Sequence, residues 1–169
     1  EVPIVMVAVP YKDVTDATLY SLRQAVARSM GTRPGARLAC VTVISGSQSD
    51  SSSDGSETSL QRKHIAALRQ WAQPLDLPGQ QTSYHVLESG DVAQALVNYA
   101  VGNEVSVIVI GAATHGLKMQ RFLATVPIKV AMDAPCTVIL VKQALPFEML
   151  TQHAGASKTA LDPDLDVPF

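Results

Sequence analysis

Five short, mostly apolar runs recur along the chain, and the segments between them carry apolar residues at helical spacing. The runs are rich in β-branched residues and are continuous rather than alternating apolar with polar. This pattern is typical of parallel strands that are buried on both faces of a sheet. The predicted strands are Ile4–Val9, Leu38–Ile44, Thr82–Leu87, Val105–Ile110 and Cys136–Val141.

Four helices are predicted between these strands from apolar residues at helical spacing and from capping and breaking residues. Asp54, with Glu57 three residues on, can cap the second helix, and Asp91 caps the third. Thr15 or Asp16 caps the first helix, which Gly31 ends. Pro74 and Pro135 end the second and the fourth. The predicted helices cover about 16–30, 60–71, 92–100 and 125–132.

The alternation of strands and helices predicts an α/β fold, an open doubly wound parallel sheet with helices on both faces and right-handed crossovers. A ligand crevice is then expected at the carboxyl ends of the strands. We expect one domain over residues 1–142, with the serine-rich stretch 45–59 as a mobile loop. Residues 143–169 are expected to form a C-terminal tail that is partly disordered.

Composition narrows the range of partners. The chain is 47% hydrophobic and 17% charged with a net charge of −2, which is typical of a globular domain and gives no basic footprint for nucleic acid or a membrane surface. Without an apolar run long enough to span a bilayer, a cytoplasmic protein is expected. Cys40 and Cys136 both lie in apolar runs, so we interpret them as small buried hydrophobic residues.

The segment Gly111–Gly116 follows the fourth predicted strand, and a helix begins near Thr125. Backbone N–H groups and the positive end of a helix dipole converge in such a strand-loop-helix passage, so it is where a phosphate would bind. Thr114 and Ala124, however, occupy points where a phosphate loop favours glycine. The sequence thus predicts a nucleotide site that is only partly retained.

No enzyme is expected. The chain has no Gly-x-Ser-x-Gly elbow, no Walker-type ending and no cluster of Cys, His and carboxylates with metal-ligand spacing. Its four histidines have no recognisable catalytic partners in spacing; they are His64, His85, His115 and His153.

The order of the elements and three local motifs resemble the universal stress protein family over about residues 3–142. The motifs are Val7-Ala8-Val9, Val41-Thr42-Val43, and the closing segment from Ile110-Gly111 to Ala134-Pro135-Cys136-Thr137-Val138. The resemblance implies a fold like that of the adenine nucleotide alpha-hydrolases, with the strand order 3-2-1-4-5.

The resemblance also implies a nucleotide site, which can be compared position by position. Members that bind ATP have glycine, two residues, glycine, nine residues, glycine, then serine or threonine; here Gly111, Thr114, Ala124 and Thr125 take those places. Pro10 stands where the family usually has an acidic residue. The full candidate set, including Val43 beside the base, is Val9, Pro10, Val43, Ile110, Gly111, Thr114, His115, Gly116, Ala124, Thr125 and Val126.

Three hypotheses follow. The first is a regulatory or signalling domain that acts through dimerisation and partner contacts, with a degenerate ATP site and no cofactor. The second is a stress sensor that keeps ATP, with Mg, or AMP in the crevice. The third is an accessory sensory domain of a larger signalling or transport protein. In the first, a homodimer is expected through the last strand at Val138, Ile139, Leu140 and Val141, because an apolar edge strand invites pairing and members of the family commonly pair there.

Overall fold

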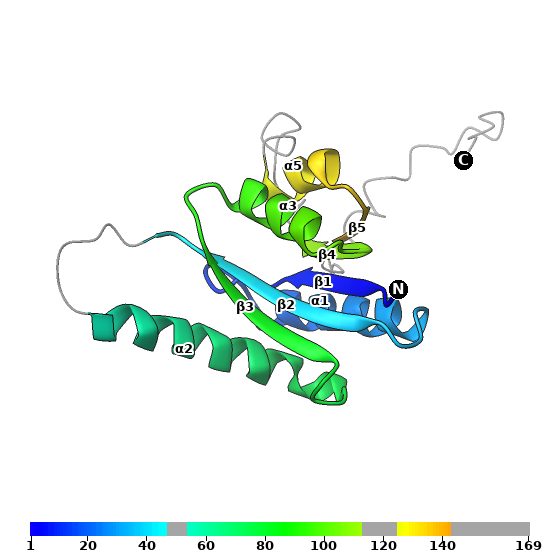
Figure 1. Cartoon of the computed structure of the whole chain (residues 1–169), viewed down its shortest axis with the longest axis horizontal. Coiled ribbons are helices and arrows are strands. Elements are labelled where there is room, and N and C mark those ends of the chain that lie inside the picture. The colour runs from blue at the N-terminus through cyan, green and yellow to red at the C-terminus, as the bar shows by residue number, and fades with distance from the viewer. Residues whose placement is uncertain (47–53, 113–124, 143–169) are drawn as a thin grey trace, which may run out of the picture.

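The sheet is five-stranded and entirely parallel, in the order β3-β2-β1-β4-β5 (Figure 1). A computed structural model of the chain describes residues 1–46, 54–112 and 125–142. Within these ranges the predicted fold class and the predicted strand order are both confirmed.

The observed elements follow the predicted ones closely. The strands are β1 (Ile4–Ala8), β2 (Arg37–Ile44), β3 (Thr82–Glu88), β4 (Val107–Gly111) and β5 (Thr137–Val141). The helices are α1 (Asp16–Gly31), α2 (Asp54–Ala72), the short 3-10 helix η1 (Gln73–Leu75), α3 (Val92–Gly102) and α5 (Val126–Asp133).

Local capping explains where α1 and α3 begin. Thr15 precedes α1 in extended backbone, and its Oγ1 accepts a hydrogen bond from the Thr18 N–H at 3.2 Å. Asp91 does the same for α3, where its Oδ1 accepts from the Gln94 N–H at 3.1 Å. Each side chain satisfies an N–H that the helix itself leaves without a partner.

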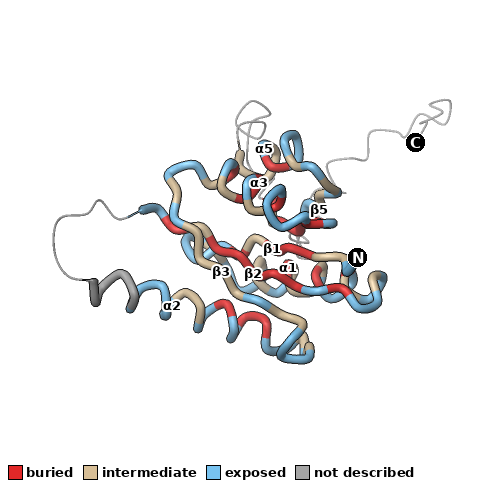
Figure 2. The backbone as a smooth tube through the Cα atoms, in the orientation of Figure 1, coloured by how far each residue is buried: buried red, intermediate tan, exposed pale blue. Residues whose placement is uncertain are grey.

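Two hydrophobic clusters lie on opposite faces of the sheet. Alternate residues of β1 show the division, since Val5 and Val7 face α1 and α2, whereas Met6 faces α3 and α5. Buried residues accordingly concentrate along the central strands and the inner sides of the helices (Figure 2). A sheet covered on both faces requires the continuous apolar runs seen in the sequence.

One boundary was wrong. The stretch 45–59 is not a single loop, because α2 begins at Asp54 and takes up its second part. The start of α2 at Asp54 agrees with the capping signal of Asp54 and Glu57, although the serine-rich composition of 45–59 favoured a loop over the whole stretch. The predicted tail 143–169 lies outside the described residues.

The two cysteines are free and face different clusters. Cys40 is fully buried on β2 against the α1 and α2 side, and burial raises the pKa of its thiol to about 12. Cys136 is half-buried and packs on the α3 and α5 side, where burial also raises its pKa. For Cys40 the interpretation as a small buried hydrophobic residue is confirmed.

Candidate functional site

The candidate crevice lies at the carboxyl ends of β1, β2 and β4. Ala8, the last residue of β1, pairs with Val41 on one side and with Ile110 on the other, so β4 ends one residue beyond β1 and β2 three residues beyond it. Beyond this point the Val9 N–H donates to the Val41 carbonyl at 2.8 Å, and the Ala112 N–H donates to the Val141 carbonyl at 2.8 Å. The sheet therefore brings Val9, Pro10 and Gly111 to one edge, as the sequence predicted.

The apolar candidates do not all face the same side. Val43, Ile110 and Val126 belong to the cluster beneath α3 and α5. Val9 instead packs with α1 and α2, where it is 7% exposed. The first three residues can therefore form one apolar wall of a crevice, and Val9 cannot contribute its side chain to that wall.

Pro10 is exposed at the end of β1. A proline side chain carries neither a carboxylate nor a hydrogen-bond donor, and its nitrogen has no hydrogen. The position can therefore offer a ligand only its carbonyl oxygen and apolar ring surface.

Thr42 fixes the end of β1 from the neighbouring strand. Its side chain is 3% exposed, and its hydroxyl donates to the Val9 carbonyl oxygen at 2.8 Å. A buried hydroxyl that is satisfied in this way stabilises the junction of the two strands where the crevice begins. Sequence reasoning quoted Thr42 as part of a motif but did not predict this role.

Gly111 ends β4 in partly buried surroundings. Within the described part of the chain, no heavy atom lies within 4 Å of a Cβ built at this position. The described part of the fold therefore does not require glycine here. The open space is compatible with a ligand that approaches the backbone closely.

The start of α5 faces the same edge of the sheet. Thr125 is its N-cap residue in extended backbone (φ −74°, ψ 155°), and Pro127 lies within the first turn. A helix start normally presents three or four N–H groups to an anion, and Pro127 removes one of them. Thr114, His115, Gly116 and Ala124, which complete the candidate set, lie outside the described residues.

An aromatic pair that sequence reasoning missed lies next to Pro10 in sequence and joins the end of β1 to α2. Tyr11, directly after Pro10, meets His64 of α2 edge-on, with 4.8 Å between ring centroids and 80° between ring planes. Tyr11 remains 42% exposed. Fifty-odd residues separate the two in sequence, so no local spacing could have indicated the contact.

Metal ligands and membrane-spanning helices can both be judged in the described ranges. No group of three or more His, Cys, Asp or Glu side chains there could hold a metal ion. Nor does any helix in those ranges combine the length and the apolar character needed to cross a bilayer.

The predicted interface strand β5 is an edge strand of the sheet. Of its four candidate residues, Ile139 and Val141 pack partly on the α1 side and Val138 partly on the α3 and α5 side. Leu140 is the most outward-facing of them, at 39% exposed.

The model of the universal stress protein family matches residues 5–142. The chain belongs to the universal stress protein family. The match ends where β5 ends, so the family domain comprises the whole described sheet. No curated protein sequence was found to match.

Solved structures of universal stress proteins share this fold. One is described as a complex with cAMP; it is 18% identical, with a TM-score of 0.63, and the match covers 84% of this chain and 98% of that one. A protein from Archaeoglobus fulgidus is 21% identical, with a TM-score of 0.59 and coverage of 83% and 93%. One from Arabidopsis thaliana with AMP bound is 14% identical, with a TM-score of 0.57 and coverage of 95% and 98%.

Proposed function

We propose that this universal stress protein domain is a regulatory or signalling module that works through dimerisation and partner contacts, and that it binds ATP weakly or not at all. The observation that carries the proposal is Pro10 at the crevice edge. Where an acidic side chain would help to hold the nucleoside, the chain presents an exposed ring without donor or charge.

The phosphate end of the crevice supports the same proposal. Pro127 takes one N–H from the first turn of α5, and the sequence has Thr114 and Ala124 in place of two glycines. If each of these three changes weakens binding by about 1–2 kcal/mol, together they reduce a micromolar affinity by roughly two to four powers of ten. The proposal includes no catalytic step and no resident cofactor.

A thermal shift experiment tests the proposal directly. With 0.1 mM MgATP, which is about a hundred times a micromolar Kd, the melting temperature of the wild type should rise by no more than about 1–2 °C. A ligand at about a hundred times its Kd would instead add about 2.7 kcal/mol and several degrees. A rise of several degrees in the wild type would overturn the proposal.

The restored variants make the test specific. Thr114→Gly with Ala124→Gly removes two Cβ atoms from the surface that phosphates approach, Pro127→Ala returns an N–H, and Pro10→Asp returns the acid. We expect a stepwise gain of ATP-dependent stabilisation over this series. Val101→Ala, a change at an exposed position on α3, serves as the control that should gain none.

The alternative is a sensor that retains a nucleotide. Its support is that two structural neighbours are described with cAMP and with AMP. AMP and cAMP each carry one phosphate, so they depend less than ATP on a complete phosphate loop. Stabilisation by AMP or cAMP without stabilisation by MgATP would favour this alternative.

The accessory-domain hypothesis remains a third proposal, in which this domain senses a signal for a larger signalling or transport protein. The sequence of the full gene product distinguishes it from the other two. For the domain itself we also propose a cytoplasmic location, which the two free thiols support because reducing compartments preserve them.

The homodimer belongs to the first proposal. Its support is the edge position of β5 and the outward-facing Leu140, because an uncovered apolar edge strand favours pairing with a second copy. A twofold arrangement lets both edges pair with each other and closes the assembly.

A further inference from the structure

The strand β3 forms the second edge of the sheet, on the opposite side from β5. It is seven residues long, and none of its residues is fully buried (Figure 2). The helix α2 packs on one face of β3, whereas α3 packs mainly on β2 and α5. In the part of the chain that the structure describes, the outer side of β3 therefore has no neighbouring strand.

Two hydrogen bonds to β2 fix which backbone groups of β3 face outward. The Leu38 N–H donates to the Gln81 carbonyl at 2.8 Å, and the Ser89 N–H donates to the Ile44 carbonyl at 3.0 Å. Residues 81 and 89 therefore direct their backbone groups toward β2, and so do the odd-numbered residues between them, because this direction alternates along a strand. The N–H and C=O groups that point away from β2 are those of Thr82, Tyr84, Val86 and Glu88.

The outward backbone groups of β3 are available for pairing. No hydrogen bond joins them to any other segment within residues 1–46, 54–112 and 125–142. An edge of this kind can accept an extended peptide, whose backbone then adds a further strand to the sheet.

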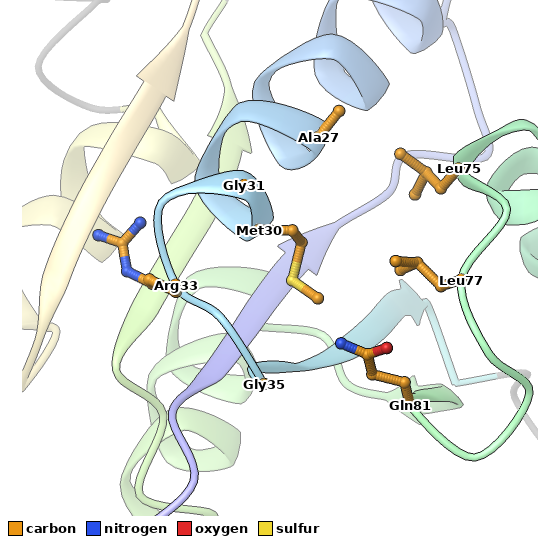
Figure 3. A pocket seen from close by; sticks show the side chains of 8 residues that line it. All are labelled: Ala27, Met30, Gly31, Arg33, Gly35, Leu75, Leu77 and Gln81. Atoms are coloured by element: carbon orange, nitrogen blue, oxygen red, sulfur yellow. The ribbon is translucent and has the colours of Figure 1, made fainter.

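The start of β3 is anchored, so the edge is held in position before a partner arrives. The Gln81 Nε2 donates to the Ala36 carbonyl at 2.6 Å. The Gln81 side chain also lines a hollow of about 290 Å³ together with Met30 and Leu77 (Figure 3). A strand that is fixed in this way loses little conformational freedom when a second strand binds to it.

Basic side chains flank this edge on the α2 side. The Arg69 guanidinium lies over the Tyr84 ring, with 5.3 Å between its central carbon and the ring centroid. Arg62 is two turns earlier on the same face of α2, and both arginines are exposed. Neither forms an ion pair with another described residue. Glu88, at the carboxyl end of β3, is the acidic residue of the strand itself, so positive charge predominates beside Tyr84.

We propose that the β3 edge binds an extended segment of a protein partner, and that this segment carries a carboxylate beside Tyr84. In an added strand, the residue paired with Tyr84 shares its face of the sheet and therefore lies near Arg69. Val86 is on that face too and packs partly on the α2 side, so an apolar residue suits the place next to it.

The proposal rests on the partner contacts of the proposed function and assigns them a place in the fold. A second copy of the chain suits this edge less well than a different protein does. Pairing through β5 closes a twofold dimer, whereas pairing through both β5 and β3 would extend the sheet without closure.

A short peptide tests the proposal on the full chain labelled with nitrogen-15. The peptide is Thr-Val-Thr-Glu-Thr-Val-Thr with blocked ends, and it reads the same in both directions, so its glutamate can lie beside Tyr84 in a parallel or an antiparallel strand. At saturation, we expect solvent exchange of the amides of Thr82, Tyr84 and Val86 to slow by roughly fivefold or more. The amides of residues 83, 85 and 87 should change much less, because they already bond to β2.

The charge preference is tested with a second peptide in which lysine replaces glutamate. It should bind roughly threefold or more weakly, because it places a like charge beside Arg69. Arg69→Gln should remove most of this difference. Arg28→Gln makes the same change at an exposed position in the last turn of α1, and it should leave the difference as it is.

A backbone variant tests the pairing itself. Val86→Pro removes an outward N–H and no bond to β2, and we expect roughly fivefold weaker binding of the glutamate peptide. Val86→Thr keeps the N–H and the β-branched shape and should bind as the wild type does. The charge comparison at Arg69 tests the proposal even where the proline variant does not fold.

Four results would overturn the proposal. They are unchanged exchange along β3, protection of Val138 and Leu140 on β5 instead, equal affinity for the two peptides, and protection of Thr82 and Tyr84 that grows with protein concentration without peptide. The last would mean that a second copy occupies the edge. Failure here would leave the MgATP thermal shift and the sedimentation behaviour as proposed, so it can be distinguished from failure of the proposed function.

Discussion

At the scale of single residues, the crevice is defined by what its side chains lack. Pro10 contributes no charge, Gly111 contributes no Cβ, and Pro127 contributes no N–H. Of these only Pro10 and Pro127 could be judged unfavourable for a nucleotide from sequence alone. The sequence could not show whether glycine at position 111 is needed for packing or leaves room for a ligand. The space around an added Cβ depends on the neighbouring strands, which only the structure places.

Gly111→Ala should leave the domain as stable as the wild type or stabilise it by up to about 1 kcal/mol. No heavy atom of the described residues lies within 4 Å of the added Cβ, and alanine reduces the entropy of the unfolded chain. Gly35→Ala is the matched control, because Gly35 has φ +77° and alanine there is strained by about 1–2 kcal/mol. Urea unfolding measures the free energy of unfolding of both variants. A clear decrease in Gly111→Ala would mean that the fold requires glycine at this position.

His85 should make the domain sensitive to mild acid. Burial lowers the pKa of its ring below the usual 6.5, and the ring contacts the Ser83 hydroxyl at 2.9 Å and lies 5.1 Å from the Tyr99 ring. Because the unfolded chain takes up the proton more readily, this contribution to stability is complete above pH 6.5 and decreases as the pH falls toward the lowered pKa. His85→Gln should therefore lose less stability than the wild type between pH 7 and pH 5, as measured by denaturant unfolding at each pH. Equal losses in the two proteins would contradict this explanation.

At the scale of elements, periodicity and capping predicted the fold well. Thr15 and Asp91 cap the helices that they were predicted to cap, and the strands agree to within two residues at either end. The start of α2 was obscured by its serine-rich context. The Tyr11 and His64 contact could not be predicted at all, because it depends on how the loop after β1 meets a helix that is distant in sequence.

Thr42 couples two elements, and Thr42→Val tests that coupling. Valine keeps the shape of the buried side chain but loses the hydroxyl that donates to the Val9 carbonyl at 2.8 Å. We expect a loss of about 1–2 kcal/mol in the free energy of unfolding, since a buried carbonyl loses a partner. Thr42→Ser keeps the hydroxyl and should recover part of this loss despite one fewer methyl group. If the valine variant proves as stable as the wild type, the hydrogen bond makes no net contribution.

At the scale of the whole molecule, the parallel sheet carries two candidate surfaces for the proposed function. Its carboxyl end carries the candidate crevice, and β5 forms an open edge. Substitutions aimed at one of these surfaces can be compared with substitutions aimed at the other.

The edge at β5 gives the last prediction, which concerns assembly. If two copies pair through β5, Leu140→Lys should shift the protein from dimer to monomer in sedimentation velocity at micromolar concentration. Leu140 is already 39% exposed, so lysine costs the single chain little, whereas in a paired edge it would bring two like charges together at the twofold axis. Val101→Lys makes the same change at a position on α3 that is 58% exposed, and this variant should remain dimeric. A wild type that sediments only as a monomer would remove the dimer from the proposed function, and a Leu140→Lys variant that stays dimeric would place the interface on another surface.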